Sequence, residues 1–383
     1  MRRVSSGDLS GAVADLGVLV PLVGALVLVN GLEPGPVLLI AGLLVVASGL
    51  GFGIPFPVQP LKALTALAVA QQLDAEIIHS AGLQIGLILV LLSVTGTADL
   101  LARVFTRPVI RALQLGVGAL LVVSAVNLVR DPPRLFDAAP DAAVGLALMT
   151  GTLALVALAA HLRRPALTLV LLAVGVAATW AADPPALGRV EATLPSLSLP
   201  AWSVAGTAFV LLVVPQLPLT YGNAVVGVSD LAREHFGAAA RRVTPGRVAL
   251  SCGLGNVAAA VAGGMPMCHG SSGFSAHVRL GARSPSMNVV LGSAFVLLGV
   301  VFPAQVLAVF GALPVWALAG FLAYAGLRHA LLVLDQRGRR LVTAVVAAGL
   351  GLVTGNLAVT TVVALLAEHG AALLARRRAV TAS

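Results

Sequence analysis

Charged residues are scarce in this sequence of 383 residues: Asp, Glu, Lys and Arg together make up 10% of it, whereas 58% of the residues are hydrophobic. A soluble protein carries about a quarter of charged residues because its surface must be hydrated, so that class is excluded. At about 20 residues per membrane crossing, the chain has room for roughly a dozen or more spans and little else. We therefore predict an all-α integral membrane protein.

Aromatic residues (4%) and cysteines (two) are also few. The net charge is +9, but the basic residues lie in short clusters, and so few aromatic side chains leave no basic surface on which bases could stack. Nucleic-acid binding is therefore not expected. His269 follows Cys268, but adjacent side chains diverge on a helix and no cluster has metal-ligand spacing. We expect no metal, no cofactor and no enzyme activity, because the intramembrane ionisable groups form no catalytic motif.

Charges, prolines and loop residues divide the apolar sequence into about fourteen segments. Cytoplasmic loops are enriched in Lys and Arg, and with the N-terminus placed inside, twenty arginines fall in cytoplasmic loops and three in external ones. We therefore predict a multi-pass protein of the plasma (inner) membrane with both termini in the cytoplasm. The segments lie near residues 12–30, 36–52, 57–72, 77–96, 108–129, 141–160, 165–182, 205–228, 247–264, 268–281, 286–303, 313–331, 340–354 and 356–375.

The third and tenth segments are interrupted in the same way. The third has three prolines between residues 55 and 60, and the tenth has Pro266 followed by a short polar stretch. Gly/Pro-interrupted segments at corresponding positions of two halves are typical of a transporter's binding site at the bilayer midplane. Because seven segments per half is an odd number, the halves must have opposite orientation. We therefore predict a seven-plus-seven inverted repeat, with repeats at residues 1–190 and 191–383.

The interrupted segments indicate an anion site. Each should enter the membrane extended and begin a helix part-way, presenting free N–H groups and a positive dipole end to the interior. Lys62 adds a full charge, which in lipid costs roughly 2.5 to 3.5 kcal/mol unless a cavity, a counter-charge or a ligand compensates. A small oxyanion suits this chemistry. The residues expected to bind it here are Gln59, Lys62, Thr65, His269, Gly270, Ser271 and Ser272.

Two further segments carry polar residues at membrane depth. Asp15, in the first, has three open roles: it neutralises Lys62 in the empty site, carries a coupling proton, or caps irregular backbone. The eighth segment is the repeat mate of the first and carries Gln216 and Thr220. Such residues often hold helices together, but because of this correspondence we expect them to line the substrate cavity.

Four stretches, in this order, resemble the signatures of the molybdate transporters related to the SulP sulfate permeases. The resemblance implies uptake of molybdate, with sulfate and tungstate as chemical relatives. It also implies the inverted-repeat fold of the uracil permease, in which the third and tenth segments meet at the substrate, and a chain without the STAS domain that SulP permeases usually carry after the last span. The stretches are Gly11–Gly17, Phe52–Ala63, Pro215–Thr220, and Met265–Gly273 with Gly281–Ser284.

The leading function is therefore secondary transport of molybdate by alternating access. A sulfate transporter of the same fold is an alternative, because both substrates are tetrahedral dianions. A proton-coupled nucleobase permease is a third reading, but that site needs carboxylates for ring N–H groups, and the tenth segment offers Cys268, His269 and Ser271 instead. The expected partners are a small oxyanion, the lipid bilayer and a coupling proton.

Overall fold

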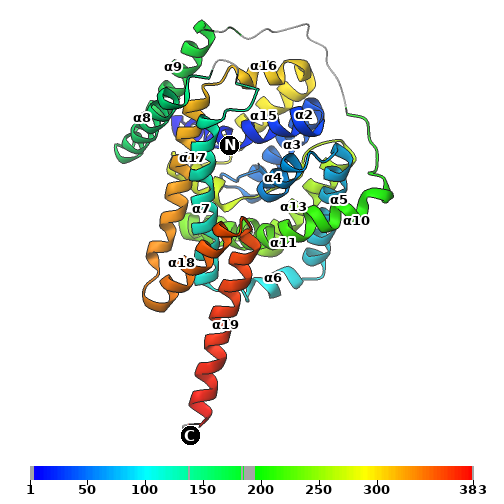
Figure 1. Ribbon diagram of the computed structural model, residues 1–383, viewed down its shortest axis with the longest axis vertical. Helices are drawn as coiled ribbons and strands as arrows, with labels where there is room; N and C mark the ends of the chain where they lie inside the picture. The colour runs from blue at the N-terminus through cyan, green and yellow to red at the C-terminus, as the bar shows by residue number, and fades with distance from the viewer. Residues whose placement is uncertain (1–3, 137–138, 183, 185–194, 382–383) are drawn as a thin grey trace.

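The computed structural model describes residues 4–136, 139–182, 184 and 195–381, with only the backbone from residue 371 onward. The described chain is almost entirely helical (Figure 1), because a helix satisfies its own backbone hydrogen bonds in lipid. The first half contains α1 (Ser6–Val13), α2 (Leu16–Asn30), α3 (Pro34–Phe52), strand β1 (Gln59–Pro60), α4 (Lys62–Ala70), α5 (Ala75–Val94), α6 (Thr97–Ala102), α7 (Arg107–Arg130), α8 (Ala142–His161) and α9 (Ala166–Ala182).

The second half repeats this plan with more irregular helices. It contains the 3-10 helix η1 (Trp202–Val204), α10 (Ala205–Ala208), the π-helix η2 (Phe209–Val213), α11 (Val214–Leu219), the π-helix η3 (Thr220–Gly227), α12 (Val228–Phe236), the 3-10 helix η4 (Gly237–Arg242), α13 (Pro245–Val261), strand β2 (Met267–Cys268), α14 (Ser271–Arg279), α15 (Ser286–Val301), the 3-10 helix η5 (Pro303–Gln305), α16 (Val306–Gly311), α17 (Val315–Ala330), the 3-10 helix η6 (Leu331–Asp335), α18 (Gly338–Val353) and α19 (Leu357–Thr381).

Each of the fourteen predicted segments contains a helix. Among the described residues, seven helices are long and apolar enough to cross a membrane, and α15 with α16 makes an eighth if this pair, bent by 106°, is one span. Apart from α19 the others are shorter, and the third and tenth segments contain helices of nine residues each. The predicted boundary between the repeats, at residue 190, lies outside the described residues.

The first and the eighth segments are longer than predicted. The first starts at Ser6 rather than near residue 12, because Ser5 and Asp8 form a capping box and Asp8 therefore belongs to the helix start. The eighth continues past residue 228 as α12. This stretch is amphipathic, with Leu231 buried and Arg233 exposed, so its charges do not end the helix.

The helices form two bundles, which lie beside each other in Figure 1. The large bundle contains α1–α5 and α10–α15, and the small bundle contains α7–α9, α17–α19 and η6. The most extensive contacts are those of α3 with α15, α5 with α13, and α7 with α17. In an inverted repeat α3 corresponds to α13 and α15 to α5, so the first two contacts are equivalent.

Glycines allow these helix pairs to approach until their backbones touch. A Cβ on Gly86 would lie 2.9 Å from the carbonyl oxygen of Gly253, and a Cβ on Gly253 would lie 2.9 Å from that of Gly86. Small residues at crossings are typical of membrane helices, which associate through close packing. The facing glycines are Gly86 with Gly253 (α5 and α13), Gly42 with Gly292 (α3 and α15) and Gly118 with Gly326 (α7 and α17).

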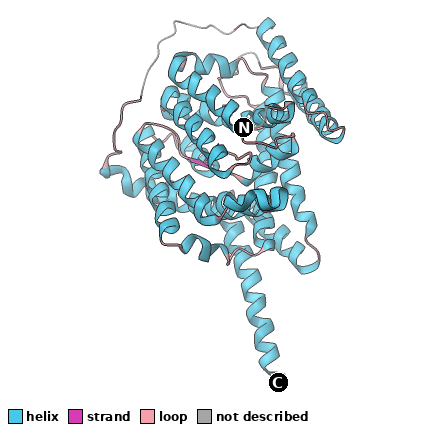
Figure 2. Cartoon of the chain, turned by 180° about the vertical axis from the view of Figure 1, so that it is seen from behind, coloured by secondary structure: helices cyan, strands magenta, loops and turns pink. Residues whose placement is uncertain are grey.

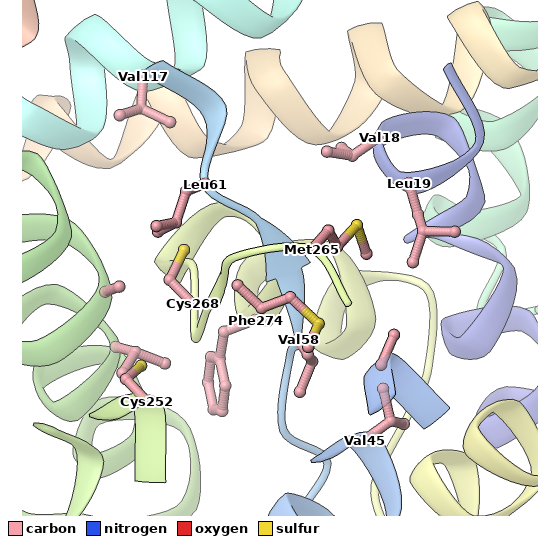
Figure 3. Packing of buried hydrophobic residues seen from close by; sticks show 14 of the residues in the cluster. Val18, Leu19, Val45, Val58, Leu61, Val117, Cys252, Met265, Cys268 and Phe274 are labelled. Carbon is pink, nitrogen blue, oxygen red and sulfur yellow. The ribbon is translucent and has the colours of Figure 1, made fainter. Parts of the chain in front are cut away.

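The two broken segments cross in the middle of the molecule, where Figure 2 shows the short strands. Strands β1 and β2 are antiparallel, with Gln59 opposite Cys268 and Pro60 opposite Met267. Buried apolar side chains, among them Leu61 and Phe274, surround this crossing (Figure 3). Because α4 and α14 begin directly after antiparallel strands, their N-termini lie close together and the two half-helices run apart.

Candidate functional site

One asparagine braces each broken segment. The carboxamide of Asn288, on α15, accepts from the N–H of Phe56 at 2.9 Å and donates to its carbonyl oxygen at 2.6 Å. Asn256, on α13, makes the same pair of bonds with Met267, at 2.8 and 2.7 Å. Extended backbone at membrane depth must have its polar groups satisfied. These two side chains satisfy it shortly before each half-helix begins.

A chain of polar contacts leads from the start of α4 into the large bundle. Lys62 Nζ donates to Gln59 Oε1 at 2.7 Å, and Gln59 Nε2 donates to Asp15 Oδ1 at 2.6 Å. Asp15 Oδ2 lies 2.8 Å from His277 Nε2, and both side chains are fully buried. Asp15 thus reaches Lys62 through Gln59, and its side chain makes no capping bond to α2.

The start of α14 packs against this chain. Ser272 Oγ lies 3.3 Å from Lys62 Nζ, from which it accepts a hydrogen bond. Gly270 leaves the room that Gln59 occupies, since a Cβ there would lie 2.7 Å from Gln59 Oε1 and 3.4 Å from Lys62 Nζ. A Cβ on Gly273 would lie 3.0 Å from Asp15 Oδ1. The first turns of both half-helices and the Lys62 ammonium group are therefore neighbours.

A cleft of about 530 Å³ leads to Lys62 between the two bundles. Its walls come from α2 and α4 on one side and from α7 and α17 on the other, and its lining includes Arg130 and Asp131 at the end of α7. Lys62 is half-buried at this cleft. An ammonium group has three hydrogens, and two of those of Lys62 are used by Gln59 and Ser272. One remains for a ligand.

The depth of Lys62 in the membrane follows from the part of α7 that lies beside it. It shares a second, water-sized cavity with Val117 and Leu120, which lie near the middle of α7. This helix has 24 residues and is therefore about 36 Å long, close to the thickness of a bilayer. Lys62 thus lies near the midplane, and Arg130 lies at the membrane face toward which the cleft leads.

Of the other predicted site residues, Gln216, Thr220 and Thr65 lie around α4. Gln216 Oε1 accepts from the N–H of Leu64 at 2.8 Å, and its Nε2 donates to Thr220 Oγ1 at 2.8 Å. This amide thus occupies one free N–H of the half-helix. It lines the small cavity beside Lys62. The hydroxyl of Thr65 is buried and has no partner among the described residues.

His269 braces the crossing instead of facing Lys62. Its Nδ1 lies 2.8 Å from the carbonyl oxygen of Pro57 and its Nε2 lies 2.9 Å from Ser251 Oγ. The ring also packs edge-on against Phe56. Both ring nitrogens are therefore engaged, so the structure does not bring His269 together with Gln59, Lys62 and Ser272 as the sequence predicts.

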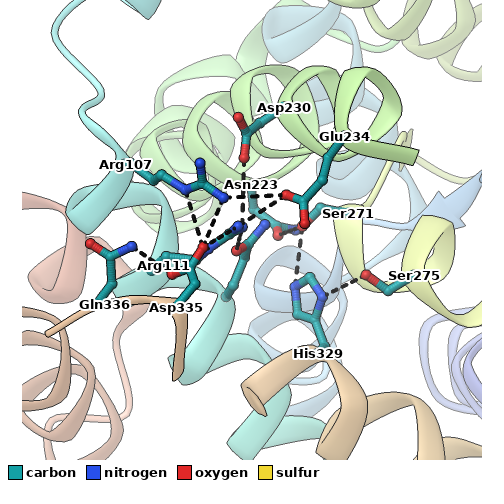
Figure 4. Close-up of polar contacts among 11 residues, drawn as sticks. Arg107, Arg111, Asn223, Asp230, Glu234, Ser271, Ser275, His329, Asp335 and Gln336 are labelled. Atoms are coloured by element: carbon teal, nitrogen blue, oxygen red, sulfur yellow. Dashed lines mark hydrogen bonds and ion pairs between the residues drawn. The ribbon is translucent and has the colours of Figure 1, made fainter. Parts of the chain in front are cut away.

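On the opposite side of Lys62 from the cleft, polar contacts join the two bundles (Figure 4). Ser271, on α14, donates to Asn223 Oδ1 and lies 3.2 Å from Nε2 of His329, on α17. The other ring nitrogen of His329 lies 3.1 Å from Ser275 Oγ. The hydroxyl hydrogen of Ser271 is used by Asn223, so Nε2 of His329 donates to Ser271 Oγ.

A second layer lies further out, at the other end of α7 from Arg130. Arg111, with a side chain 1% exposed, contacts Asp335 at 2.7 Å, Glu234 at 3.1 Å and Asp230 at 3.5 Å. Arg107 contacts Asp335 at 2.9 Å. We call these five residues the gate cluster. They link α7 and η6 of the small bundle to α12 of the large bundle (Figure 4).

Several of these residues were missed by reasoning from the sequence. Asn256 and Asn288 are single asparagines in apolar helices, and this isolation is the feature of the sequence that could have pointed to them. No pattern in the sequence points to His277, and Arg111 is one of the twenty arginines that the charge distribution assigns to cytoplasmic loops. The contacts that place them in the site join residues 11 to 266 positions apart along the chain, so the sequence pattern does not reveal them.

Residues 7–121 and 208–329 match the family described as "Molybdate transporter of MFS superfamily". The chain is 28% identical to Molybdate transporter 2 of Arabidopsis thaliana, over 88% of this chain and 81% of that protein. It is also 28% identical to Molybdate transporter 1 of Chlamydomonas reinhardtii, over 88% and 86%. These relatives are transporters and not enzymes, in agreement with the prediction from the sequence.

Two solved structures resemble the fold. The transmembrane domain of the cyanobacterial bicarbonate transporter BicA aligns with a TM-score of 0.61 and 17% identity, over 94% of this chain and 96% of that one. The murine anion transporter Slc26a9, in the inward-facing state, aligns with a TM-score of 0.60 and 13% identity, over 98% and 69%. They confirm the predicted fold class, an all-α multi-pass membrane protein built as a seven-plus-seven inverted repeat.

Proposed function

Because this chain belongs to the molybdate transporter family, we propose that it imports molybdate across the membrane as a secondary transporter. The observation that carries the proposal is the meeting of two half-helix N-termini at Lys62, at the end of a cleft that reaches the midplane. Free N–H groups and a positive dipole end favour negative charge at each helix start. The ammonium group of Lys62 adds a full charge and a free donor.

The proposed binding residues differ in how directly they would contact the anion. Lys62, Ser272 and the first N–H groups of α4 and α14 would bind its oxygens. The hydroxyl of Thr65, on α4, is unpaired as far as the chain is described and could bind as well. Gln59, Gln216 and Thr220 would hold these donors in place. Gly270 and Ser271 would do so as well. Sulfate is the alternative ligand, because a second tetrahedral dianion would use the same donors.

We propose that transport proceeds by alternating access, with one bundle moving against the other. The cleft supports this mechanism, because it leads from Lys62 toward the membrane face at Arg130. On the other side, the contacts of His329 and the gate cluster join the bundles. The arginine distribution predicts that Arg130 is outside and Arg111 inside. This conformation would then accept substrate from outside, and release into the cytoplasm would require both polar layers to separate.

The test of the substrate is uptake of radiolabelled molybdate into proteoliposomes that contain the purified protein. Tungstate, sulfate and uracil are added in excess as competitors. We expect saturable uptake that tungstate blocks and sulfate blocks weakly. Transport of sulfate or uracil without molybdate uptake would contradict the substrate assignment and leave the fold unaffected.

The test of the site is Lys62→Met in the same assay. A hydrogen bond to a charged group contributes about 1.5 to 3 kcal/mol, so the affinity for molybdate should fall about ten- to a hundredfold. Arg103→Met removes an exposed positive charge remote from the cleft lining and is the matched control. Unchanged affinity in Lys62→Met would show that the anion binds elsewhere.

The test of alternating access uses Ser124→Cys, because Ser124 is exposed in the cleft. A membrane-impermeant thiol reagent should label this cysteine from the outer side, and the two native cysteines are buried. Adding Glu234→Gln and Asp335→Asn weakens the gate cluster and should slow the labelling, since the outward-open conformation becomes less populated. Labelling from the inner side alone would reverse the proposed orientation.

A further inference from the structure

Asp15 and His277 form a buried pair, and the two atoms that face each other are in hydrogen-bonding distance. Asp15 Oδ2 and His277 Nε2 are 2.8 Å apart, with side chains 1% and 0% exposed. Neither atom has another polar partner among the described residues. A buried carboxylate or imidazole nitrogen without a partner is costly. Asp15 Oδ2 and His277 Nε2 must therefore satisfy each other inside the large bundle.

The surroundings of this unit determine where its protons are. His277 Nδ1 lies 2.7 Å from the carbonyl oxygen of Gly11, which can only accept, so Nδ1 carries a hydrogen. In a neutral imidazole the other nitrogen, Nε2, is then a bare acceptor. It would face the carboxylate oxygen of Asp15, which is also an acceptor. The 2.8 Å contact therefore requires one additional proton between these two atoms.

The same reasoning fixes the orientation of the Gln59 amide, which links Asp15 to Lys62 in the anion site. Lys62 has only donors, so Gln59 must present its oxygen to Lys62 and its NH₂ group to Asp15 Oδ1. The second oxygen of Asp15 is then left for His277. The proton on the pair and the ammonium group of Lys62 are separated by one side chain, Gln59.

The proton also alters the charge of the site. Two helix ends contribute about half a positive charge each, and the charge of Lys62 is offset by that of Asp15. Without the extra proton, a bound dianion would leave about one excess negative charge at the midplane, where uncompensated charge is costly. With the proton on His277, the loaded site is close to neutral.

We propose that the Asp15–His277 pair is a proton-binding site that is occupied when the dianion is bound, so that the protein carries a proton together with molybdate. This inference rests on the proposed function. The proton forms an N–H bond at His277 Nε2 and leaves the same atom after release of the anion. Gly17 and Val18, two and three residues after Asp15, line the cleft, so Asp15 is close in sequence to its wall.

Other ionisable groups surround the pair at greater distance. The groups on α4 and β2 are Lys62 and Cys268, and both are near Asp15. His329, on the neighbouring α17, is already bonded to two serines, and Asp8, on α1, accepts from the backbone of Arg283 and Ser284. The ionisable groups on the elements packed around the pair are Lys62, Cys268, Asp8, Arg107, Arg111, Arg130, Tyr221, Asp230, Arg233, Glu234, His235, Arg279, Tyr324, Arg328 and His329.

The first experiment measures accumulation of labelled molybdate in proteoliposomes with an acidic exterior and an internal pH dye. For each coupled proton, a gradient of one pH unit should raise the accumulation ratio about tenfold, because one pH unit equals about 1.4 kcal/mol. The dye should report internal acidification that depends on molybdate. Net uptake of molybdate that neither responds to the pH gradient nor acidifies the interior would refute this inference and leave the proposed function intact. Absence of exchange for every anion would refute the proposed function itself.

Two substitutions should act in opposite directions on anion affinity. In Asp15→Asn the amide can donate to a neutral His277 and still accept from Gln59, so the contacts persist without a titrating proton and the site keeps the charge of the protonated form. Its affinity should stay high as the pH rises, while that of the wild type falls. His277→Gln removes the proton acceptor and should bind weakly at every pH. His161→Gln, at the exposed end of α8, is the control and should behave as the wild type.

A measurement on the wild type covers the case in which the variants do not fold. Molybdate is added to the purified protein in weakly buffered solution at several values between about pH 5 and 8, where a histidine usually titrates. We expect protons to be taken up with the anion over part of this range. Binding of molybdate without proton uptake at any of these values would overturn the proposal, as would Asp15→Asn and His277→Gln variants that keep the pH dependence of the wild type.

Discussion

The two half-helices are built by the same device and carry different chemistry. α4 and α14 each have nine residues, each follows a short strand, and each is preceded by a residue that an asparagine carboxamide braces on both backbone groups. α4 then presents a lysine to the cleft, whereas α14 presents serines and two glycines that make room for Gln59. The backbone frame is thus common to both repeats. The charge is supplied by one, and the space and the hydroxyl groups by the other.

The common frame can be tested by removing its braces. Asn288→Leu leaves the N–H and C=O of Phe56 unpaired, and Asn256→Leu does the same for Met267. Each unpaired buried group costs about 1 to 3 kcal/mol, so each variant should lose several kcal/mol of stability, the largest effect expected here. Thermal unfolding in detergent would measure it. Asn127→Leu, an exposed asparagine of α7, is the control, and a large difference between the two brace variants would mean that the frames are not equivalent.

The space provided by α14 can be tested with Gly273→Val. A side chain there would push Gln59 and Asp15 from their places, since even a Cβ would lie 3.0 Å from Asp15 Oδ1. Overpacking costs about 1 to 3 kcal/mol of stability, and we expect loss of molybdate binding as well. Calorimetric titration of the folded variant would measure this. Gly151→Val, at a position of α8 with open space around it, is the control, and binding that survives in Gly273→Val would argue against the role of Gln59.

The hydroxyl of α14 should matter less than the charge of α4. Ser272→Ala removes one neutral hydroxyl that accepts from Lys62, so affinity should fall by a factor of about 2 to 12, corresponding to 0.5 to 1.5 kcal/mol. The comparison is with Lys62→Met in the same titration. If Ser272→Ala weakened binding more than Lys62→Met, the assignment of charge to α4 and of shape to α14 would be reversed.

The smallest effect is expected on α4 itself, at Thr65. Its buried hydroxyl has no hydrogen-bond partner within the described part of the chain, so Thr65→Val should not lower the stability of the empty protein. If the hydroxyl binds the anion, affinity should fall by up to about tenfold. Unfolding with and without molybdate separates the two quantities. Stabilisation by molybdate that equals that of the wild type would exclude Thr65 from the site.

Much of the fold could be predicted from the sequence because proline and charge act locally. The prolines at residues 55 to 60 and at 266 interrupt their helices in any surroundings, and the fourteen segments follow from apolar runs between charges. The local rule failed at Asp8 and in α12, where charged residues belong to the helix through a cap or an exposed face. A charged residue marks the end of a helix only where it neither caps the helix nor lies on an exposed face.

The site was predictable in its position and only partly in its contacts. Lys62 and Gln59 could be found because polar residues beside interrupted helices at membrane depth are rare. The role of His269 could not be predicted, because it depends on hydrogen bonds of its two ring nitrogens to Pro57 and Ser251, which come from other parts of the chain. Asp15 and His277 are far apart in the chain, and their 2.8 Å contact arises only from the packing of α1 and α14.

The glycine crossings have a mechanical consequence. Gly86 with Gly253 and Gly42 with Gly292 lie within the large bundle, and Gly118 with Gly326 lies within the small one. Where backbone touches backbone there is no layer of side chains to compress or to change rotamer, so each bundle should be stiff. The seam between the bundles contains instead a cleft and polar contacts, which can break and re-form. Elastic deformation should therefore concentrate at the seam, and a displacement of the large bundle would carry both half-helices and Lys62 together, as one rigid lever, past α7 and α17.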